Sequence, residues 1–164
     1  MTLAISVRIA KPSDAAAIAA LVNHAYAVEA DFVEGERTTA HEIAAMMDAG
    51  MFVVLADDAH QALAASVYVE AKHERAYLGM LSVEPALQGM GLGRRLVRVA
   101  EAIGEAMGAP AIELKIVNLR EELARWYRSL GYSEVGTAPY NHRPVKRPCH
   151  FVEMRKSLVT AAHA

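Results

Sequence analysis

Three glycines and two arginines form the stretch of the sequence that is best suited to chemistry. The stretch reads Gln-Gly-Met-Gly-Leu-Gly-Arg-Arg and runs from Gln88 to Arg95. Glycine lets a phosphate approach the backbone closely and allows positive φ angles, while arginine supplies positive charge. These residue types therefore predict an anion site. A tight turn that holds no ligand is the alternative.

The segments on either side predict where this glycine loop (88–95) lies in the fold. An apolar run over 76–83 precedes the loop and is typical of a buried strand. After the loop, apolar residues recur at the steps of an amphipathic helix, at Leu92, Leu96, Val99, Ile103 and Met107. The first N–H groups of a helix lack internal partners and lie at the positive end of its dipole. A strand-to-helix turn at this place therefore favours phosphate binding.

Two other kinds of phosphate-binding loop do not fit the sequence. A dinucleotide fingerprint, Gly-x-Gly-x-x-Gly, would begin at Gly89 but would need a third glycine where the chain has Arg94. A Walker loop needs Gly-Lys followed by Ser or Thr, and no part of the sequence contains it. The glycine loop is therefore of another type.

The pattern Gln-x-x-Gly-x-Gly, formed by Gln88, Gly91 and Gly93 after a strand that ends in Val-Glu-Pro, resembles the pyrophosphate loop of the GNAT superfamily of acyl-CoA-dependent N-acetyltransferases. The resemblance implies that acetyl-CoA is the cosubstrate. Its acetyl group would pass directly to a primary amine of a small molecule, a protein or a peptide. A non-catalytic acyl-CoA-binding or sensing module is the alternative. The likeness spans 7–158, but only the glycine loop and the segment 118–132 carry specific motifs.

The resemblance also implies which residues bind the cofactor. The backbone groups of Leu81 and Val83 would pair with the pantetheine arm, and one N–H group would polarise the thioester carbonyl. Asn118 would contact pantetheine or CoA, although Asn-x-x-Glu at this place also resembles a helix cap. The pyrophosphate would lie against the glycine loop, at Gln88, Gly89, Met90, Gly91, Leu92, Gly93 and Arg94.

Tyr127 is the candidate catalytic residue and a further cofactor contact. It stands four positions before Gly131 and so matches the family ending Tyr-x-x-x-Gly-Phe/Tyr. In that family the tyrosine donates a proton to the leaving thiolate. The alternative is a packed core aromatic, because Tyr127 shares an apolar helix face with Leu123 and Leu130.

No general base is assigned. Many family members carry a glutamate about six residues before the last valine of the strand that precedes the loop, and this chain has Tyr77 there. Glu70, His73 and Glu74 stand nearby in the sequence, and a water relay is an equal alternative. Each of the three side chains also fits a turn or a surface position.

The sequence pattern predicts a single-domain α/β protein in which the core covers about 5–158 of residues 1–164. A mixed sheet of about seven strands would contain an antiparallel meander and a parallel pair that opens at the cofactor cleft. About four helices would flank it. The expected strands cover 5–9, 51–56, 63–69, 76–83, 111–117, 133–137 and 149–156. The first expected helix begins after a cap at Asp14. The other three cover 40–49, 92–107 and 121–130.

Two loops of opposite charge leave the charge of the acceptor open. The segment 29–39 contains four carboxylates and Arg37, and by resemblance it overhangs the acceptor pocket. The loop 139–148 is basic and rich in proline, which would suit an acidic partner or RNA. A solvated loop is the alternative for both.

The composition limits the class of protein. The chain has 164 residues and a net charge of −2, which argues against a general nucleic-acid binder. It has no apolar run long enough for a membrane span and no signal sequence, so a cytoplasmic protein is expected. Cys149 is the single cysteine, and the seven histidines show no metal-ligand spacing, so no metal site is expected. A homodimer through an edge strand is compatible with the sequence, which does not show one.

Overall fold

The computed structural model describes residues 4–159, and the strands in this range form one mixed sheet in the order β1-β2-β3-β4-β5-β7-β6. The strands are β1 (Ile5–Ile9), β2 (Met51–Asp57), β3 (Leu63–Lys72), β4 (Arg75–Val83), β5 (Ala111–Val117), β6 (Ser133–Pro139) and β7 (His150–Ser157). The helices are α1 (Ala15–Ala25), α2 (Ala40–Met46), α3 (Leu92–Ala106) and α4 (Glu121–Ser129). Three short 3₁₀ turns are η1 (Pro12–Asp14), η2 (Tyr26–Glu29) and η3 (Pro85–Leu87). The expected fold class is confirmed.

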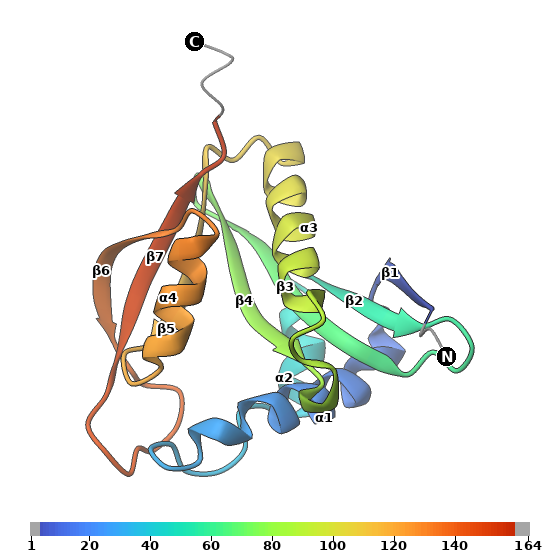
Figure 1. Ribbon diagram of the computed structural model, residues 1–164, viewed down its shortest axis with the longest axis horizontal. Helices are drawn as coiled ribbons and strands as arrows, with labels where there is room; N and C mark the ends of the chain where they lie inside the picture. Colours follow the sequence, from blue (N-terminus) through green and yellow to red (C-terminus); the bar gives the residue numbers. More distant parts are fainter. Residues whose placement is uncertain (1–3, 160–164) are drawn as a thin grey trace.

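Helices cover both faces of the sheet, as Figure 1 shows. Along β2, Phe52 and Val54 pack against α1 and α2, while Val53 and Leu55 face α3. Successive side chains of a strand point to opposite faces, so a strand that is covered on both sides reads as a continuous apolar run. This explains the sequence Met-Phe-Val-Val-Leu-Ala of β2.

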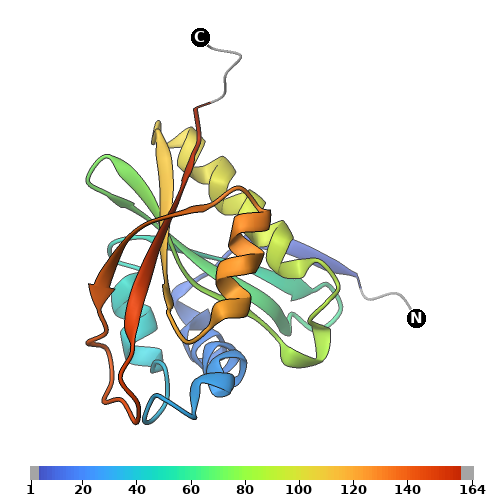
Figure 2. The ribbon, with the colours of Figure 1, turned by 60° about the vertical axis from the view of Figure 1, so that its left-hand side comes forward.

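The parallel strands β4 and β5 are paired over a very short length. Their register contains only the pairs Ala76–Ile112 and Tyr77–Glu113 among the described residues. Beyond these pairs the strands diverge, and Figures 1 and 2 show β4 leaving β5 at an angle. A shift in the β3–β4 register places an extra residue in β4 where Met80 has a φ of 49°. A bulge of this kind bends a strand, so it helps to open the sheet as expected.

Two expected helix caps are wrong in detail. Asn118 does not cap α4, because its side-chain oxygen accepts a hydrogen bond from the N–H group of His150 at 2.8 Å. The N-cap of α4 is Arg120 instead. Asp14 stands at the N-cap position of α1, as expected, but its carboxylate makes no capping bond to that helix and instead accepts from the N–H group of Lys11 at 2.7 Å, at the start of η1. Both side chains bond to nearby backbone, but outside the expected helix.

The first strand is present as expected, but its apolar residues are unevenly buried. Ile5 packs against the core, whereas Ile9 is 62% exposed and Val7 is 43% exposed. Arg8 is half-buried and pairs with Asp14 at 2.8 Å. β1 lies at one edge of the sheet, so alternation of apolar residues there does not require that all of them be buried.

The other differences are short. α2 ends at Met46, and a turn carries the chain to Gly50. β6 and β7 form the expected antiparallel hairpin, with β7 between β5 and β6. Within residues 4–159, no helix has the length and apolar character needed to cross a membrane.

Candidate active site

The divergence of β4 and β5 opens a cleft of about 610 Å³ between β4, β5, the start of α3 and α4. The residues expected at the cofactor that line it are Leu81, Val83, Gln88, Gly89, Gly91, Leu92, Gly93, Arg94 and Tyr127. Met90 is not part of this lining, and its side chain is 60% exposed. Asn118 lines a separate pocket beside α4. The cleft therefore brings most of the expected residues together and leaves these two outside.

The glycine loop presents backbone donors to the cleft. Gly89 and Gly91 have φ angles of 84° and 81°, which side chains rarely adopt. The first intrahelical bond of α3 joins the N–H group of Arg95 to Gly91. Among the described residues, the six N–H groups from Gly89 to Arg94 have no acceptor. Free donors at a helix start, with the Arg94 guanidinium beside them, form a site for the phosphates of a ligand.

The edge of β4 that faces the cleft has no strand partner at Leu81 and Val83, although the Val83 carbonyl accepts a hydrogen bond from the side chain of Gln88 at 3.4 Å. The N–H group of Glu84 donates to Ala64 of β3 at 2.8 Å. Backbone groups alternate between the two edges of a strand, so those of Val83, and of Leu81 two residues earlier, point to the opposite edge, toward β5. β5 is too far from this part of β4 to pair with it. An extended ligand can therefore add to β4 as a further strand.

Tyr127 lines the cleft from α4. It is only 4% exposed and packs edge to face against Trp126 and Tyr132, at centroid distances of 4.9 and 5.5 Å. Burial raises the pKa of Tyr127, and the neighbouring Tyr26 and Tyr77 raise it further. The hydroxyl is therefore protonated at physiological pH and can act as a donor. Tyr127 is both a packed aromatic and a lining residue.

Several cleft residues were not foreseen from the sequence. Trp126, Arg120 and Glu122 line the cleft from α4 and its N-terminus, and Tyr26 lines it from η2. Trp126 lies close to the glycine loop, because a Cβ atom on Gly93 would be 3.5 Å from its ring. Trp126 could have been predicted at the site, because it is the single tryptophan and stands next to Tyr127 in the sequence. No sequence signal identifies Tyr26 or Arg120 as cleft residues, because only the folded chain brings them to the cleft.

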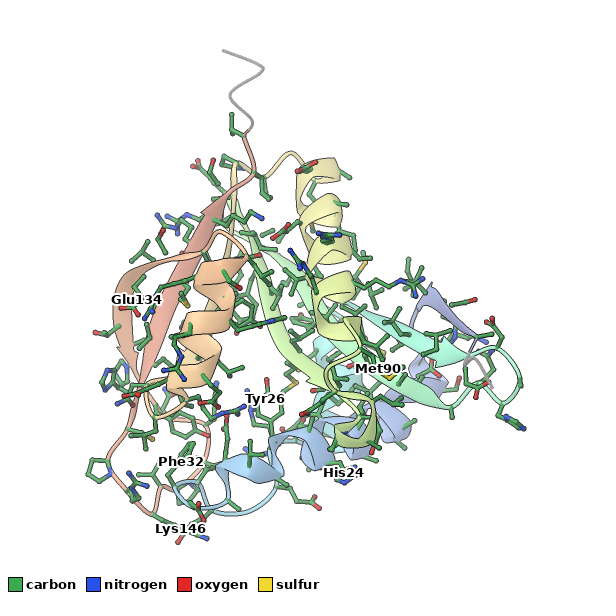
Figure 3. The ribbon with its side chains drawn as sticks, in the orientation of Figure 1. His24, Tyr26, Phe32, Met90, Glu134 and Lys146 are labelled. Carbon is green, nitrogen blue, oxygen red and sulfur yellow. The ribbon has the colours of Figure 1, made fainter. Side chains whose placement is uncertain are left out.

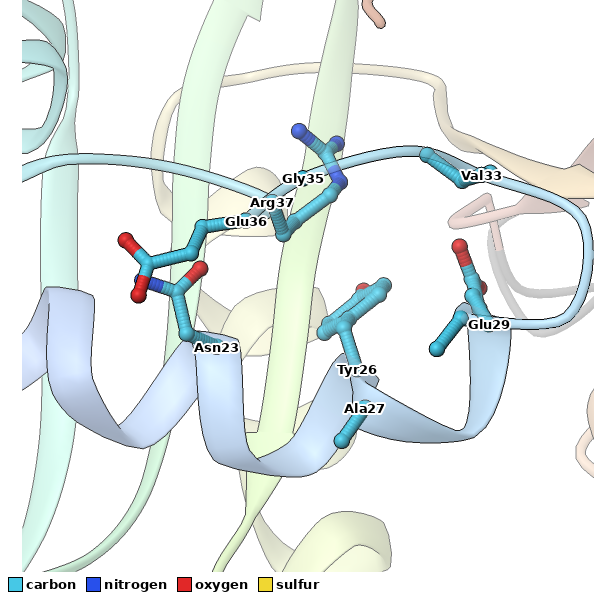
Figure 4. Close-up of a pocket in the computed structure, with 9 residues that line it drawn as sticks. Asn23, Tyr26, Ala27, Glu29, Val33, Gly35, Glu36 and Arg37 are labelled. Carbon is cyan, nitrogen blue, oxygen red and sulfur yellow. The ribbon is translucent and has the colours of Figure 1, made fainter. Parts of the chain in front are cut away.

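A second cavity of about 240 Å³ adjoins the cleft and lies between η2 and the segment 33–37. Tyr26 lines both spaces, and Figure 3 shows it at the base of the opening between β4 and α4. Tyr26 and Arg37 both line this cavity (Figure 4), and the Arg37 guanidinium lies 5.6 Å from the centre of the Tyr26 ring. The cavity therefore meets the cleft at Tyr26.

The carboxylate of Glu29 lines the second cavity and binds Arg120, a residue that lines the cleft. Its side chain is 7% exposed and pairs with Arg120 at 2.8 Å, and Arg120 also bonds to Glu122. Burial raises the pKa of Glu29, and the Arg120 charge opposes this rise. The solvated-loop interpretation of the acidic segment is therefore wrong for Glu29, which is a structural part of the site.

The two oppositely charged loops lie side by side (Figures 1 and 2). Val33 and Val145 form an isolated antiparallel bridge, and the N–H group of Lys146 donates to Phe32 at 2.8 Å. Arg143 pairs with Glu42 at 2.7 Å. The basic loop is therefore held against the acidic segment by backbone contacts, while most of its side chains stay exposed, as expected of a solvated loop. Arg143 is its one ion-paired cation among the described residues, and its partner Glu42 lies on α2.

The three possible bases named from the sequence do not line the cleft. His73 and Glu74 form the β3–β4 turn and line a pocket with the end of α3, at the other end of β4. Glu70 is the partner of Tyr77 in the β3–β4 ladder and is not part of the cleft lining. Tyr77 is half-buried, and burial raises its pKa. The cleft thus contains neither a carboxylate on β4 nor one of these three side chains.

The fold is similar to that of several solved structures that are named as acetyltransferases. One is assigned as a phosphinothricin N-acetyltransferase, with 18% identity, a TM-score of 0.79 and coverage of 96% of this chain and 100% of that chain. A second, from Salmonella typhimurium, is assigned as an acetyltransferase and contains its cofactor acetyl-CoA, with 20% identity, a TM-score of 0.75 and coverage of 97% and 96%. A third is the ribosomal-protein-S18-alanine N-acetyltransferase from Escherichia coli, with 18% identity, a TM-score of 0.71 and coverage of 96% of each chain.

Comparison by sequence identifies one family. No curated protein sequence matches the chain significantly. The family model of the acetyltransferase (GNAT) family matches residues 18–132, which include the glycine loop and Tyr127. The chain therefore belongs to the GNAT acetyltransferase family, and it is an acyltransferase that takes its acetyl group from acetyl-CoA.

Proposed function

We propose that the cleft binds the pantetheine arm and thioester of acetyl-CoA along β4, and that a primary amine attacks the thioester directly. The free backbone groups of the cleft carry this proposal. The six N–H groups from Gly89 to Arg94 suit the pyrophosphate, and the free edge of β4 at Leu81 and Val83 suits the amides of the arm. The acceptor would enter from the side of η2, where Tyr26 joins the cleft to the second cavity.

The proposed reaction proceeds without a covalent enzyme intermediate. The neutral amine nitrogen forms a bond to the thioester carbon, and an N–H group of β4 at Leu81 or Val83 stabilises the resulting oxyanion. The carbon–sulfur bond then breaks, and the electron pair goes to sulfur. Tyr127 donates its proton to this sulfur, and the proton that leaves the nitrogen returns to the phenol through solvent.

Substitution of Tyr127 tests this role. Tyr127→Phe keeps the packing of the ring and removes the proton donor, so kcat should fall about 100-fold or more while the KM for acetyl-CoA changes little. Release of free CoA thiol measures both. The matched control is Tyr132→Phe, because the Tyr132 hydroxyl donates to Glu101 at 2.8 Å and lies outside the cleft lining. Wild-type kcat in Tyr127→Phe would refute the proposed donor.

We also propose that the protein acts in the cytoplasm on an amine that is free or carried by a peptide. The lone thiol of Cys149 suits a reducing compartment, and the net charge of −2 does not favour nucleic acid as a partner. Measurement of RNA binding at low salt tests the second point, and no detectable binding is expected.

A further inference from the structure

All but one of the half-buried arginines of the described residues form an ion pair with a carboxylate. Among residues 4–159 the half-buried arginines are Arg8, Arg37, Arg120, Arg143 and Arg155. Four of them pair with a carboxylate at 2.9 Å or less, with Asp14, Glu29, Glu42 and Glu113 as partners. Within the described part of the chain, Arg37 has no carboxylate within ion-pair distance. Partial burial of a guanidinium is costly without such a partner.

Arg37 is held where a ligand could supply the missing charge. Its guanidinium lies over the Tyr26 ring and lines the cavity of about 240 Å³ beside the cleft. Stacking on a ring fixes the plane of the guanidinium and leaves its N–H donors free for a bidentate acceptor. Burial raises the pKa of Tyr26 and of Tyr77, and the charge of Arg37 opposes both rises.

The carboxylates of the same cavity do not neutralise Arg37. Glu29 is bound to Arg120, and Glu42, outside the cavity, is bound to Arg143. Glu36 is exposed, and Figure 4 shows its side chain directed toward Asn23, away from Arg37. Of the charged side chains that line this cavity, Glu29 is therefore paired, Glu36 is exposed, and Arg37 is half-buried without an ion-pair partner among the described residues.

We propose that Arg37 binds the carboxylate of the acceptor, so that the acceptor is a small amine that carries a carboxylate, with free amino acids as the simplest class. This inference rests on the proposed function, because it takes the Tyr26 side of the cleft as the acceptor entrance. A carboxylate on Arg37 would place the rest of an amino acid beside Tyr26, at the junction with the cleft. Arg37 is then a specificity-determining residue that does not touch the thioester.

Paired acceptors test this proposal. The twenty L-amino acids and their carboxamides, which lack the negative charge, are compared by CoA thiol release at fixed acetyl-CoA. A charge-assisted bidentate hydrogen bond should give the best amino acid at least a tenfold higher kcat/KM than its own carboxamide. In Arg37→Gln this ratio should fall to within about twofold of one, and Arg37→Lys should keep part of it.

The matched control is Arg98→Gln, which removes the same charge from an exposed position on α3. It should keep the wild-type ratio, and both glutamine variants should keep the thermal shift caused by acetyl-CoA. The proposal is overturned if the enzyme accepts amines but prefers carboxamides or polyamines, if it accepts no amino acid, or if Arg37→Gln keeps the ratio. Failure of acetyl-CoA to bind the wild type, or of every amine to release CoA, would instead reject the proposed function and with it this inference.

Discussion

The two ends of the cleft are built in different ways. The donor end consists of consecutive residues, from Gln88 to Arg94, and it offers backbone N–H groups. The proposed acceptor end is assembled from η2, the segment 29–39, the loop 139–148 and the start of α4. Its side-chain contacts join residues 91, 101 and 116 positions apart, in the pairs Glu29–Arg120, Glu42–Arg143 and Ala30–Lys146. One end is local in the sequence, and the other is not.

This difference separates cofactor binding from acceptor choice. Backbone donors are present whatever the side chains are, provided that glycine permits the conformation at positions such as Gly89 and Gly91. The acceptor end depends on the identity of side chains such as Arg37 and Tyr26. Substitutions can therefore change the acceptor end without disturbing the phosphate site. The following variants test how complete this separation is.

The largest expected effect is on the acceptor end. Arg120→Met should lower the free energy of unfolding by about 3 kcal/mol, because it leaves Glu29 buried without its cation. Urea unfolding measures the change. Arg125→Met is the control, since Arg125 is exposed on the same helix, and it should change stability by no more than about 0.5 kcal/mol. Equal effects of the two variants would show that the long-range ion pair does not hold the acceptor end together.

A smaller effect is expected at the donor end. Gly91→Ala should weaken acetyl-CoA binding about tenfold or more, because alanine disfavours the φ of 81° that presents the N–H groups. Titration calorimetry measures the affinity. Gly108→Ala provides a close control, because Gly108 has a φ of 79°, equally open surroundings and a place beyond the other end of α3. Both variants should lose about 1–2 kcal/mol of stability. The comparison fails if Gly108→Ala weakens acetyl-CoA binding as much as Gly91→Ala does.

The smallest expected effect is on stability and comes from the ion pair Arg8–Asp14, which lies outside both ends of the cleft. This effect depends on pH. Hydrogen bonding and the charge of Arg8 lower the pKa of Asp14 to about 2, from 3.8. The folded state therefore binds this proton less readily than the unfolded state, so the pair stabilises the fold above about pH 4 and loses this effect as the pH falls toward 2. The wild type should exceed Asp14→Asn by about 1–2 kcal/mol at pH 7, and urea unfolding should show this difference shrinking below pH 4. A difference that stays constant down to pH 3 would contradict the assignment. Affinity for acetyl-CoA should be equal in the two proteins.

The donor end could be predicted from the sequence because its signals are local. Glycine spacing, the preceding apolar strand and the helical stripe all lie within about thirty residues, and the structure has the glycine loop at the start of α3. Met90 is an exception, because membership of the loop does not determine where its side chain points. Asn118 is another, because the same side chain can cap a helix or, as here, bond to the backbone of His150.

The acceptor end could not be predicted in the same way. Four acidic residues in a short segment are typical of a solvated loop, and Glu29 differs from the others only because the fold brings Arg120 to it. Likewise, Arg143 of the basic loop pairs with Glu42, which is far away in the sequence. Among the half-buried arginines of residues 4–159, Arg37 is then the one without such a partner. It can be identified only when the partners of the other arginines are known.

The long-range construction of the acceptor end also has a consequence for biosynthesis. A growing chain that has left the ribosome as far as α3 already contains β1 to β4 and the glycine loop. Glu29 gains its cation only when Arg120 emerges, and Val33 gains its bridge only when Val145 emerges. Because synthesis proceeds from the N-terminus, the phosphate site can form first and the acceptor cavity is completed among the last steps. A chain that stops before residue 143 would therefore carry the donor loop without an assembled place for its acceptor.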